Sequence, residues 1–207
     1  PDVPGLYTHQ APSVDAVILS HAHLDHYGLM DFIHPDIPVY MNEESKDLLE
    51  IGTIFYPEAL QQNEVQTHTK TFRQWKSFQV GPFTIKPYLM DHSAFGGSAF
   101  LIEADGKKVF YTGDFRGHGR SGALQKTILK DPIVDIDALL LEGTTLGGKH
   151  FVGFDSEEAV ENELYSIFAS QKDTSFVTAA GSNIDRLVSV YKAAMNAGKT
   201  FVIDLYQ

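Results

Sequence analysis

One short stretch, His21-Ala22-His23-Leu24-Asp25-His26, constrains the fold and the chemistry of this chain more than any other. It directly follows the apolar run from Val14 to Leu19 and Ser20, and such a run predicts a buried strand that leads into a loop. Open α/β sheets usually keep their ligand sites in loops at the ends of strands. We therefore expect an α/β fold with a functional site at the end of this strand.

The side chains of this loop are candidate ligands for first-row metal ions, because neutral imidazoles and ionised carboxylates bind such ions. His21 and His23 flank a small residue, so in an extended loop both rings can face one cation. Asp25 and His26 follow closely enough to reach a second cation beside the first. The alternative is a solvated histidine-rich turn, which the density of donors in six residues disfavours.

Two later strand ends carry further candidate ligands. A predicted hairpin over residues 78–80 and 83–89 ends in Asp91-His92-Ser93, and a third histidine is what a closed coordination shell would still lack. A second predicted hairpin, residues 99–104 with 107–112, leads into Gly113 and Asp114. An aspartate at such a point commonly caps a turn, and the alternative is a carboxylate that bridges two metals.

Together these residues resemble the signature of the metallo-β-lactamase superfamily, in which His-x-His-x-Asp-His follows an apolar strand and a later His and a Thr-Gly-Asp complete the set. The resemblance implies an αββα sandwich that holds two divalent cations. One cation would be held by His21, His23 and His92, and the second by Asp25 and His26, with Asp114 bridging the two. Zinc is the default for these donors, and manganese and iron stay open.

The last third of the sequence alternates predicted strands and helices, which is typical of parallel strands with crossover helices. Strands are expected over residues 138–141, which we take as buried, 175–178 and 200–205. One helix is expected from an Asp155–Glu158 capping box to about Ser170, and another from Asn183 or Asp185 to Gly198. The glycine-rich segment before them, Gly117 to Gly122 with basic residues in and just before it, is interpreted as a plain surface loop, with a mobile loop beside the site as the alternative.

The segment Ser182-Asn183-Ile184-Asp185-Arg186 and the Glu-Gly-Thr-Thr at residues 142–145 are similar to the β-CASP branch of the superfamily, in particular to ribonuclease J. This resemblance implies that Glu142 is the acidic residue of the first β-CASP motif. Residues 1–150 would form a metallo-β-lactamase core that lacks its early strands, and residues 151–207 would begin a Rossmann-like β-CASP domain. The family's last second-site histidine has no candidate after His150, so we interpret the chain as an incomplete fragment.

Charge and composition exclude some classes of protein. A net charge of −11 argues against non-specific nucleic-acid binding through a basic surface, but not against a nuclease, because bound cations invert the local field. No segment approaches about 18 consecutive apolar residues, so we expect no membrane span. The chain has no cysteine, which excludes disulfides and thiolate ligands and is compatible with the cytoplasm, its expected location.

The expected function is metal-dependent hydrolysis of RNA phosphodiester bonds by a metal-bound hydroxide. Asp25, Asp114 and Glu142 are the candidate catalytic residues, and Asp25 would orient or deprotonate the attacking water if one ion is absent. Two alternatives stay open: a small-molecule hydrolase of the same superfamily, acting on thioesters, lactones or β-lactams, and a non-catalytic β-CASP scaffold. Endonucleolytic and exonucleolytic cleavage both stay open.

Overall fold

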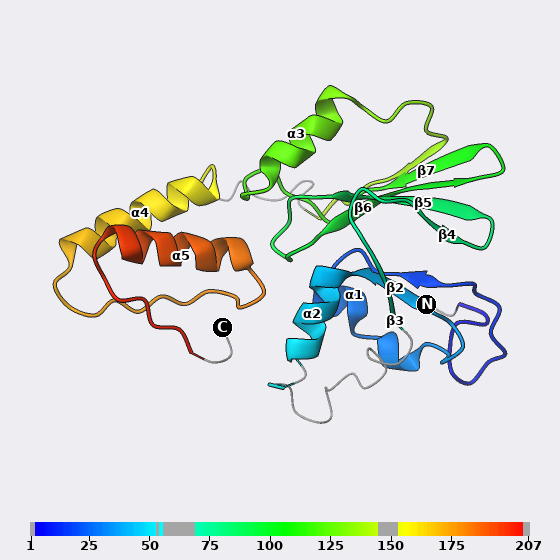
Figure 1. The fold of residues 1–207 in the computed structure, drawn as a ribbon, viewed down its shortest axis with the longest axis horizontal. Coiled ribbons are helices and arrows are strands. Elements are labelled where there is room, and N and C mark those ends of the chain that lie inside the picture. The colour runs from blue at the N-terminus through cyan, green and yellow to red at the C-terminus, as the bar shows by residue number, and fades with distance from the viewer. Residues whose placement is uncertain (1–2, 53, 56–68, 145–152, 205–207) are drawn as a thin grey trace.

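The computed structural model of the chain describes residues 3–52, 54–55, 69–144 and 153–204. Two β-sheets face each other in it, with helices outside them (Figure 1). The first sheet is parallel, in the order β1-β2-β3: β1 (Val17–Ile18), β2 (Val39–Asn42) and β3 (Thr69–Phe72). The second has the order β4-β5-β6-β7-β8: β4 (Phe78–Val80), β5 (Phe83–Leu89), β6 (Ser98–Ala104), β7 (Lys107–Tyr111) and β8 (Ala138–Leu140). Its strands are antiparallel except for the parallel pair β7 and β8.

Both predicted hairpins are confirmed. The β4–β5 turn contains Gly81 at a φ of 52°, and the β6–β7 turn contains Asp105 and Gly106 at φ values of 51° and 71°. Two consecutive positive φ values are what a two-residue hairpin loop of the type I′ class requires, and an Asp-Gly pair adopts them readily. The turn chemistry visible in the sequence therefore sets the register of β6 against β7.

Apolar side chains alternate between the two faces of each sheet and thereby create a layered core. On β6, Phe100 and Ile102 pack into the cluster between the sheets, whereas Ala99 and Leu101 pack into the cluster on the outer face. On β2, Tyr40 faces the other sheet and Met41 faces the outer helices. This alternation gives the αββα order of layers, which confirms the fold class expected from the sequence.

Short helices cover the outer faces of the two sheets. The first sheet is covered by α1 (Leu24–Tyr27), the 3₁₀ helix η1 (Met30–Phe32) and α2 (Glu43–Gly52), and the second by α3 (Gly122–Lys130). Asn42 caps α2, because its Oδ1 accepts a hydrogen bond of 2.6 Å from the Ser45 backbone N–H. The sequence pattern did not predict β3.

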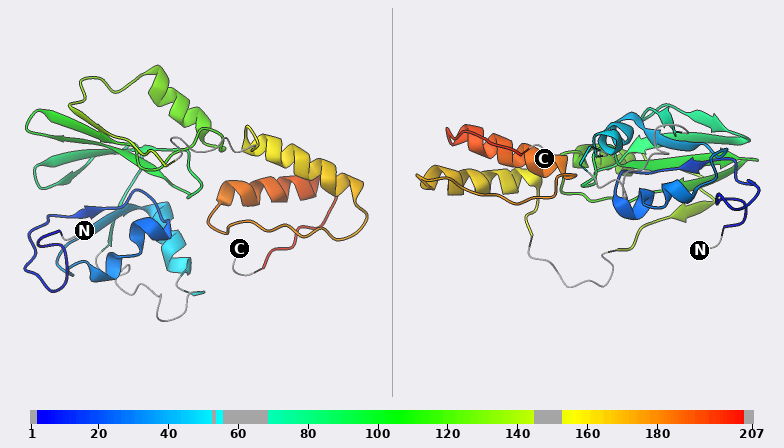
Figure 2. Two further views of the ribbon diagram at one scale, coloured as in Figure 1. Left: turned by 180° about the vertical axis from the view of Figure 1, so that it is seen from behind. Right: turned by 90° about the horizontal axis from the view of Figure 1, so that it is seen from below.

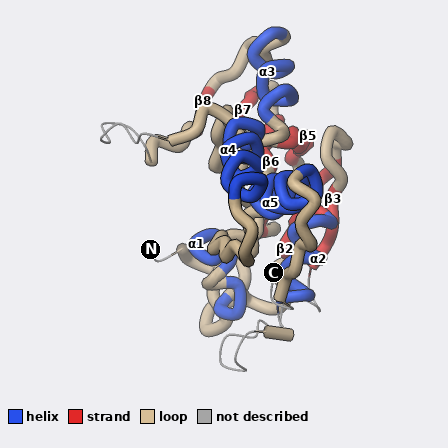
Figure 3. Tube along the Cα trace, turned by 90° about the vertical axis from the view of Figure 1, so that its left-hand side faces the viewer, coloured by secondary structure: helices blue, strands red, loops and turns tan. Residues whose placement is uncertain are grey.

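The two remaining helices, α4 (Glu157–Ser170) and α5 (Ile184–Asn196), pack against each other beside the two-sheet core, as Figures 2 and 3 show from other sides. Their mutual contact is apolar and includes Phe168, Val190 and Ala193. Asn183 caps α5 through its side chain, as predicted. The capping box predicted at Asp155 was wrong in its position: Ser156 is the N-cap of α4, and its hydroxyl accepts from the Ala159 backbone N–H.

Three strand predictions in the last third need correction. Residues 175–178 and 200–204 form no strand in the described structure, because neither segment has a paired neighbour there, and Phe176 is 94% exposed. Strand β8 does form, but it is not buried, since Leu139 and Leu140 are more than half exposed at the edge of the sheet. The first strand is also shorter than the apolar run that predicted it.

No helix in the described part of the chain is long and apolar enough to cross a membrane.

Candidate metal centre

The candidate ligands lie on loops that follow the ends of three strands from both sheets. His21 comes shortly after β1, His92 shortly after β5, and Asp114 shortly after β7. A backbone hydrogen bond of 3.0 Å from Ser98 N–H to Ser20 O joins the first and second sheets at this edge. Gly113 makes the close approach possible, because a Cβ there would lie 2.6 Å from the Ser98 carbonyl oxygen. Residues far apart in the sequence thus meet at one edge of the sandwich.

Three histidines form the first group of donors. His21, His23 and His92 each offer a ring nitrogen, and these nitrogens lie within 4.8 Å of one another. The ring centroids of His21 are 4.8 Å from those of His23 and 4.6 Å from those of His92. The contact between His92 Nε2 and His23 Nδ1 is 3.1 Å. The structure therefore brings together the three residues predicted to hold the first cation.

A second group shares His21 with the first and adds His26 and Asp114, again with donor atoms within 4.8 Å of one another. Asp114 Oδ2 lies 3.4 Å from His26 Nε2 and 3.9 Å from both His21 Nε2 and His92 Nε2. One carboxylate oxygen therefore lies close to imidazoles of both groups. This central position is the arrangement expected for a bridging ligand.

Asp25 and Glu142 lie differently from these donors. The Asp25 side chain is 79% exposed, and its Oδ2 is 3.8 Å from His26 Nε2, so it borders the second group without belonging to it. Glu142 Oε1 accepts a hydrogen bond of 2.5 Å from the backbone N–H of Phe115, the residue after Asp114. Glu142 is thus engaged in holding the loop of a candidate ligand, and a catalytic role for it stays a prediction.

The site favours neutral imidazoles, which is the form that binds metal. Burial, reinforced by the neighbouring His26, His92 and His23, lowers the pKa of His21 to about 2. Burial also lowers the pKa of His92 to about 4, with a further contribution from His23. Burial lowers the pKa of His23, against the opposing charge of Asp25. Desolvation disfavours imidazolium, so these rings keep their lone pairs free near neutral pH.

The surroundings of His21 fit a bound cation. His21 is 0% exposed, and its Nε2 has no hydrogen-bond partner among the described residues, although a buried polar atom normally finds one. Its Nδ1 lies 3.0 Å from the Ser20 hydroxyl oxygen. When Nδ1 donates to that hydroxyl, the lone pair of Nε2 points toward Asp114, which is the usual orientation of a metal-binding histidine. The residues present therefore fit a divalent cation.

Two residues beside the site have roles that the sequence did not reveal. Asp91 precedes His92 and is 1% exposed, and Arg116 follows Asp114 by two positions and has an 11% exposed side chain. The interpretation of Gly117 to Gly122 as a plain surface loop was also wrong, since Gly119 and Arg120 bond to acidic side chains, as Arg116 just before them does. An ion pair made by a buried arginine in a loop leaves no periodic signal in a sequence. The only sequence signal for Arg116 is that it lies two positions after Asp114.

The fold and these donors define a two-sheet α/β protein with a histidine–aspartate cluster that fits divalent cations at the strand ends. A family model described as "Beta-lactamase superfamily domain" matches residues 2–161, and the chain belongs to this superfamily. A solved protein of unknown function from Enterococcus faecalis V583 has the same fold, with a TM-score of 0.78 and 22% identity over 95% of this chain and 54% of that one.

Curated relatives include ribonucleases. Ribonuclease J of Sinorhizobium meliloti is 27% identical over 222 residues, which cover 98% of this chain and 36% of that protein. An RNase J-like protein of Methanocaldococcus jannaschii is 31% identical over 140 residues, covering 64% of this chain and 32% of that protein. The resemblance to ribonuclease J predicted from the sequence is thereby confirmed. The chain spans about a third of the length of these relatives.

Proposed function

We propose that the chain carries the two-cation site of a hydrolase that cleaves RNA phosphodiester bonds. The observation that carries the proposal is the pair of donor groups that share His21, one of three imidazoles and one of two imidazoles with Asp114. Relatives named ribonuclease J and RNase J-like protein support RNA as the substrate class. We further propose that residues 1–150 act as the metallo-β-lactamase core and that residues 151–207 begin a β-CASP-like domain.

The chain's own residues would share the work in three parts. His21, His23 and His92 would hold one cation, and His26 would hold the other together with Asp114, whose carboxylate lies close to both donor groups. When bound, divalent cations lower the pKa of water and offset the charge of a phosphate group. Asp25, which is exposed at the rim of the second donor group, is placed to hold or accept a proton from the attacking water. Ser20 and Glu142 keep His21 and the loop after Asp114 in place.

Zinc is the proposed cation, with manganese and iron as alternatives, because imidazole and carboxylate ligands bind all three. Because the net charge of the chain is −11, bound cations would offset its repulsion of a phosphate backbone. Elemental analysis of the chain, purified without added metal, tests the donor set directly. Two ions per chain are expected, and an absence of metal would contradict the proposed site.

Replacing Asp114 by alanine tests the proposed activity. We expect the variant to lose one of its two ions and to cleave a labelled single-stranded RNA no faster than buffer, because the carboxylate shared by both donor groups is gone. Asp47→Ala is the matched control, since it removes an exposed carboxylate from α2, and it should cleave like the unaltered chain. Unchanged RNA cleavage by Asp114→Ala would contradict the assignment.

The same measurements separate the competing functions. A chain that binds two ions and hydrolyses thioesters or lactones, but leaves RNA intact, would be a small-molecule hydrolase. A chain that binds the ions and hydrolyses neither kind of substrate would be a scaffold. Only RNA cleavage that depends on Asp114 supports the proposed function.

A further inference from the structure

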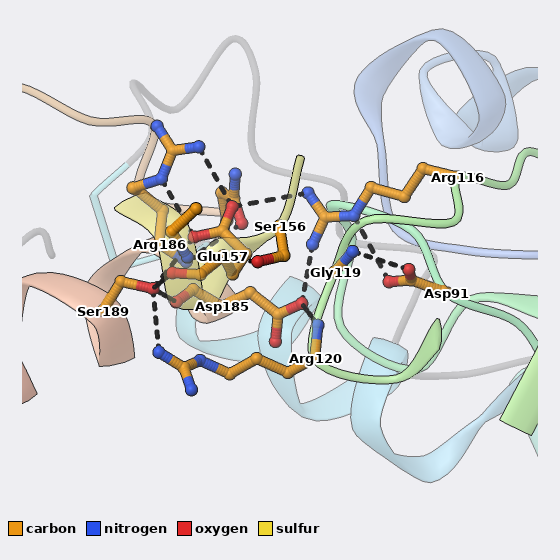
Figure 4. Close-up of polar contacts among 11 residues, drawn as sticks. Asp91, Arg116, Gly119, Arg120, Ser156, Glu157, Asp185, Arg186 and Ser189 are labelled. Carbon is orange, nitrogen blue, oxygen red and sulfur yellow. Dashed lines mark hydrogen bonds and ion pairs between the residues drawn. The ribbon is translucent and has the colours of Figure 1, made fainter. Parts of the chain in front are cut away.

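A network of charged residues joins the loops of two candidate metal ligands to the helix pair α4–α5 (Figure 4). We call it the Arg116 network and define it by Asp91, Arg116, Glu157 and Asp185. Its first two members lie beside the metal centre in the sequence, Asp91 before His92 and Arg116 two positions after Asp114. Its last two members lie at the start of the helices, since Glu157 is the first residue of α4 and Asp185 the second of α5.

On the side of the metal centre, Asp91 and Arg116 fasten the two ligand loops to each other. The Arg116 backbone N–H donates to the Asp91 carbonyl at 2.7 Å, and its Nε donates to Asp91 Oδ1 at 3.3 Å. The Gly119 N–H donates to the other carboxylate oxygen at 2.7 Å. A Cβ at Gly119 would lie 2.0 Å from Asp91 Oδ1, so the loop fits this closely only with glycine there.

On the side of the helices, the same guanidinium reaches two further carboxylates. Arg116 Nη2 donates to Asp185 Oδ2 at 2.6 Å, and Nη1 lies 3.9 Å from Glu157 Oε1. The guanidinium is planar and carries five N–H groups, so one side chain can donate hydrogen bonds to carboxylates on opposite sides. A lysine ammonium at this position is a single point charge and could not span them.

Hydrogen bonds join the two helices to each other and to the loops beside the candidate metal centre. Arg186 of α5 donates two hydrogen bonds, of 3.1 and 3.0 Å, to the Glu157 carboxylate of α4. The Glu157 backbone N–H donates to the His118 carbonyl at 2.9 Å. Ala94, two residues after His92, pairs as an isolated β-bridge with Asn183, the N-cap of α5. Both helices are therefore attached to the loops that follow His92 and Asp114.

We propose that Arg116 is a positioning residue of the metal centre, which sets His92 and Asp114 at binding distance by fixing their loops against the α4–α5 pair. Buried ion pairs add little net stability compared with apolar packing, so stability alone does not account for this placement. The inference rests on one part of the proposed function, that His92 and Asp114 hold cations. It does not depend on the substrate.

Cobalt binding to the full chain tests the proposal, because cobalt(II) is a coloured substitute for zinc whose visible spectrum reports the geometry of its ligands. Asp185→Asn removes the charge of the nearer of the two helix carboxylates at Arg116 and leaves every candidate ligand in place. We expect it to bind cobalt about tenfold more weakly, the usual effect of losing a residue that orients ligands, and to shift the visible bands. Glu161→Gln is the matched control: Glu161 of α4 pairs with Arg120 of the same loop, and the described structure gives it no hydrogen bond or ion pair with Arg116.

A second variant, Arg116→Lys, keeps the positive charge and removes the planar fork, and we expect it to weaken cobalt binding as Asp185→Asn does. Arg116→Lys also tests the positioning role of Arg116 if Asp185→Asn fails to fold, which circular dichroism would show. Unaltered cobalt affinity and spectrum in folded Asp185→Asn or Arg116→Lys would overturn the positioning role, even if both variants melt earlier. An equal loss in Glu161→Gln would also overturn it.

Failure of the proposed function gives different results. An unaltered chain that binds no cobalt would overturn the proposed metal site and this inference with it. An unaltered chain that binds cobalt but does not cleave RNA would overturn the proposed substrate alone. In that case a weakened cobalt affinity in Asp185→Asn would still support the positioning role of Arg116.

Discussion

At the scale of single residues, the metal centre depends on the burial of one imidazole. His21 is shared by both donor groups, and it contacts the rings of His23, His26 and His92. Such crowding would be repulsive if the rings were charged, and burial keeps the pKa of His21 and His92 low enough to prevent this. The Ser20 hydroxyl is the contact that orients His21 within this cluster of imidazole rings.

Replacing Ser20 by alanine should weaken zinc binding about tenfold, because the hydroxyl fixes the orientation of the shared imidazole. Competition with a fluorescent zinc chelator would measure the affinity. Ser45→Ala is the matched control, since it also deletes a buried hydroxyl, one that has no hydrogen-bond partner among the described residues. Ser45→Ala should bind zinc normally and lose no stability. Equal affinities of the two variants would show that Ser20 does not orient His21.

At the scale of elements, the site depends on how closely the turn after β7 approaches β6. Gly113 has a φ of 58°, and a Cβ there would meet the Ser98 carbonyl oxygen at 2.6 Å. Both the left-handed backbone and the close contact therefore exclude a side chain. Asp114 follows at once, so this glycine determines where the bridging candidate lies.

Gly113→Ala should lower the free energy of unfolding by about 2–3 kcal/mol, since it combines an unfavourable φ with a clash against backbone. Two control variants separate these causes in urea unfolding. Gly106→Ala has a φ of 71° but open space, so it should cost about 1 kcal/mol. Gly117→Ala has open space and no positive φ, so it should cost close to nothing. A Gly113→Ala variant no less stable than Gly106→Ala would contradict the clash.

The elements also show how far the sequence predicts the fold. The hairpins were predictable because Asp105-Gly106 and Gly81 are local turn signals, and the order of the ligands was predictable from the motif. The exposure of Leu139 and Leu140 was not predictable, because an apolar strand has the same sequence pattern at the edge of a sheet as at its centre. The Arg116 pairing was equally hidden, since it joins residues from three separate segments.

At the scale of the whole molecule, ionic contacts tie the α4–α5 pair to the sandwich. Glu157 lies at their centre, 2% exposed, and it faces Arg116 from the loop after β7 and Arg186 and Ser189 from α5. Burial opposes the ionisation of Glu157. Hydrogen bonds from Arg186 and Ser189, with the charges of Arg186 and Arg116, outweigh it, so the pKa of Glu157 lies below its ordinary value of 4.5.

This depressed pKa gives a pH dependence of known sign. The stabilising contribution of Glu157 is fully present above its unfolded-state pKa of 4.5 and is lost as the pH falls through the lower folded-state value. Urea unfolding of the chain and of Glu157→Gln should therefore differ most near pH 7, and the difference should shrink below about pH 4.5. A difference that grows with acidification would contradict the ionic role of Glu157.

Removal of metal should also lower the thermal stability of the whole molecule. Cations that bind only the folded chain stabilise it by mass action, by about 2.7 kcal/mol when free zinc is one hundred times its dissociation constant. A chelator should therefore lower the melting temperature, and added zinc should restore it. Asp114→Ala should show a smaller shift than Asp47→Ala. Melting temperatures that do not respond to zinc in the unaltered chain would contradict a folded-state site.

The candidate ligands are far apart in the sequence, and this separation affects when the site can form during synthesis and folding. His21 leaves the ribosome long before Asp114, and the two become neighbours only when β7 has paired with β6. A nascent chain therefore passes through a period in which its first histidines are present without the partners that complete the site. Capture of the proposed cations would thus be a late step of biogenesis, and metal supply would act on a nearly finished fold rather than on its early stages.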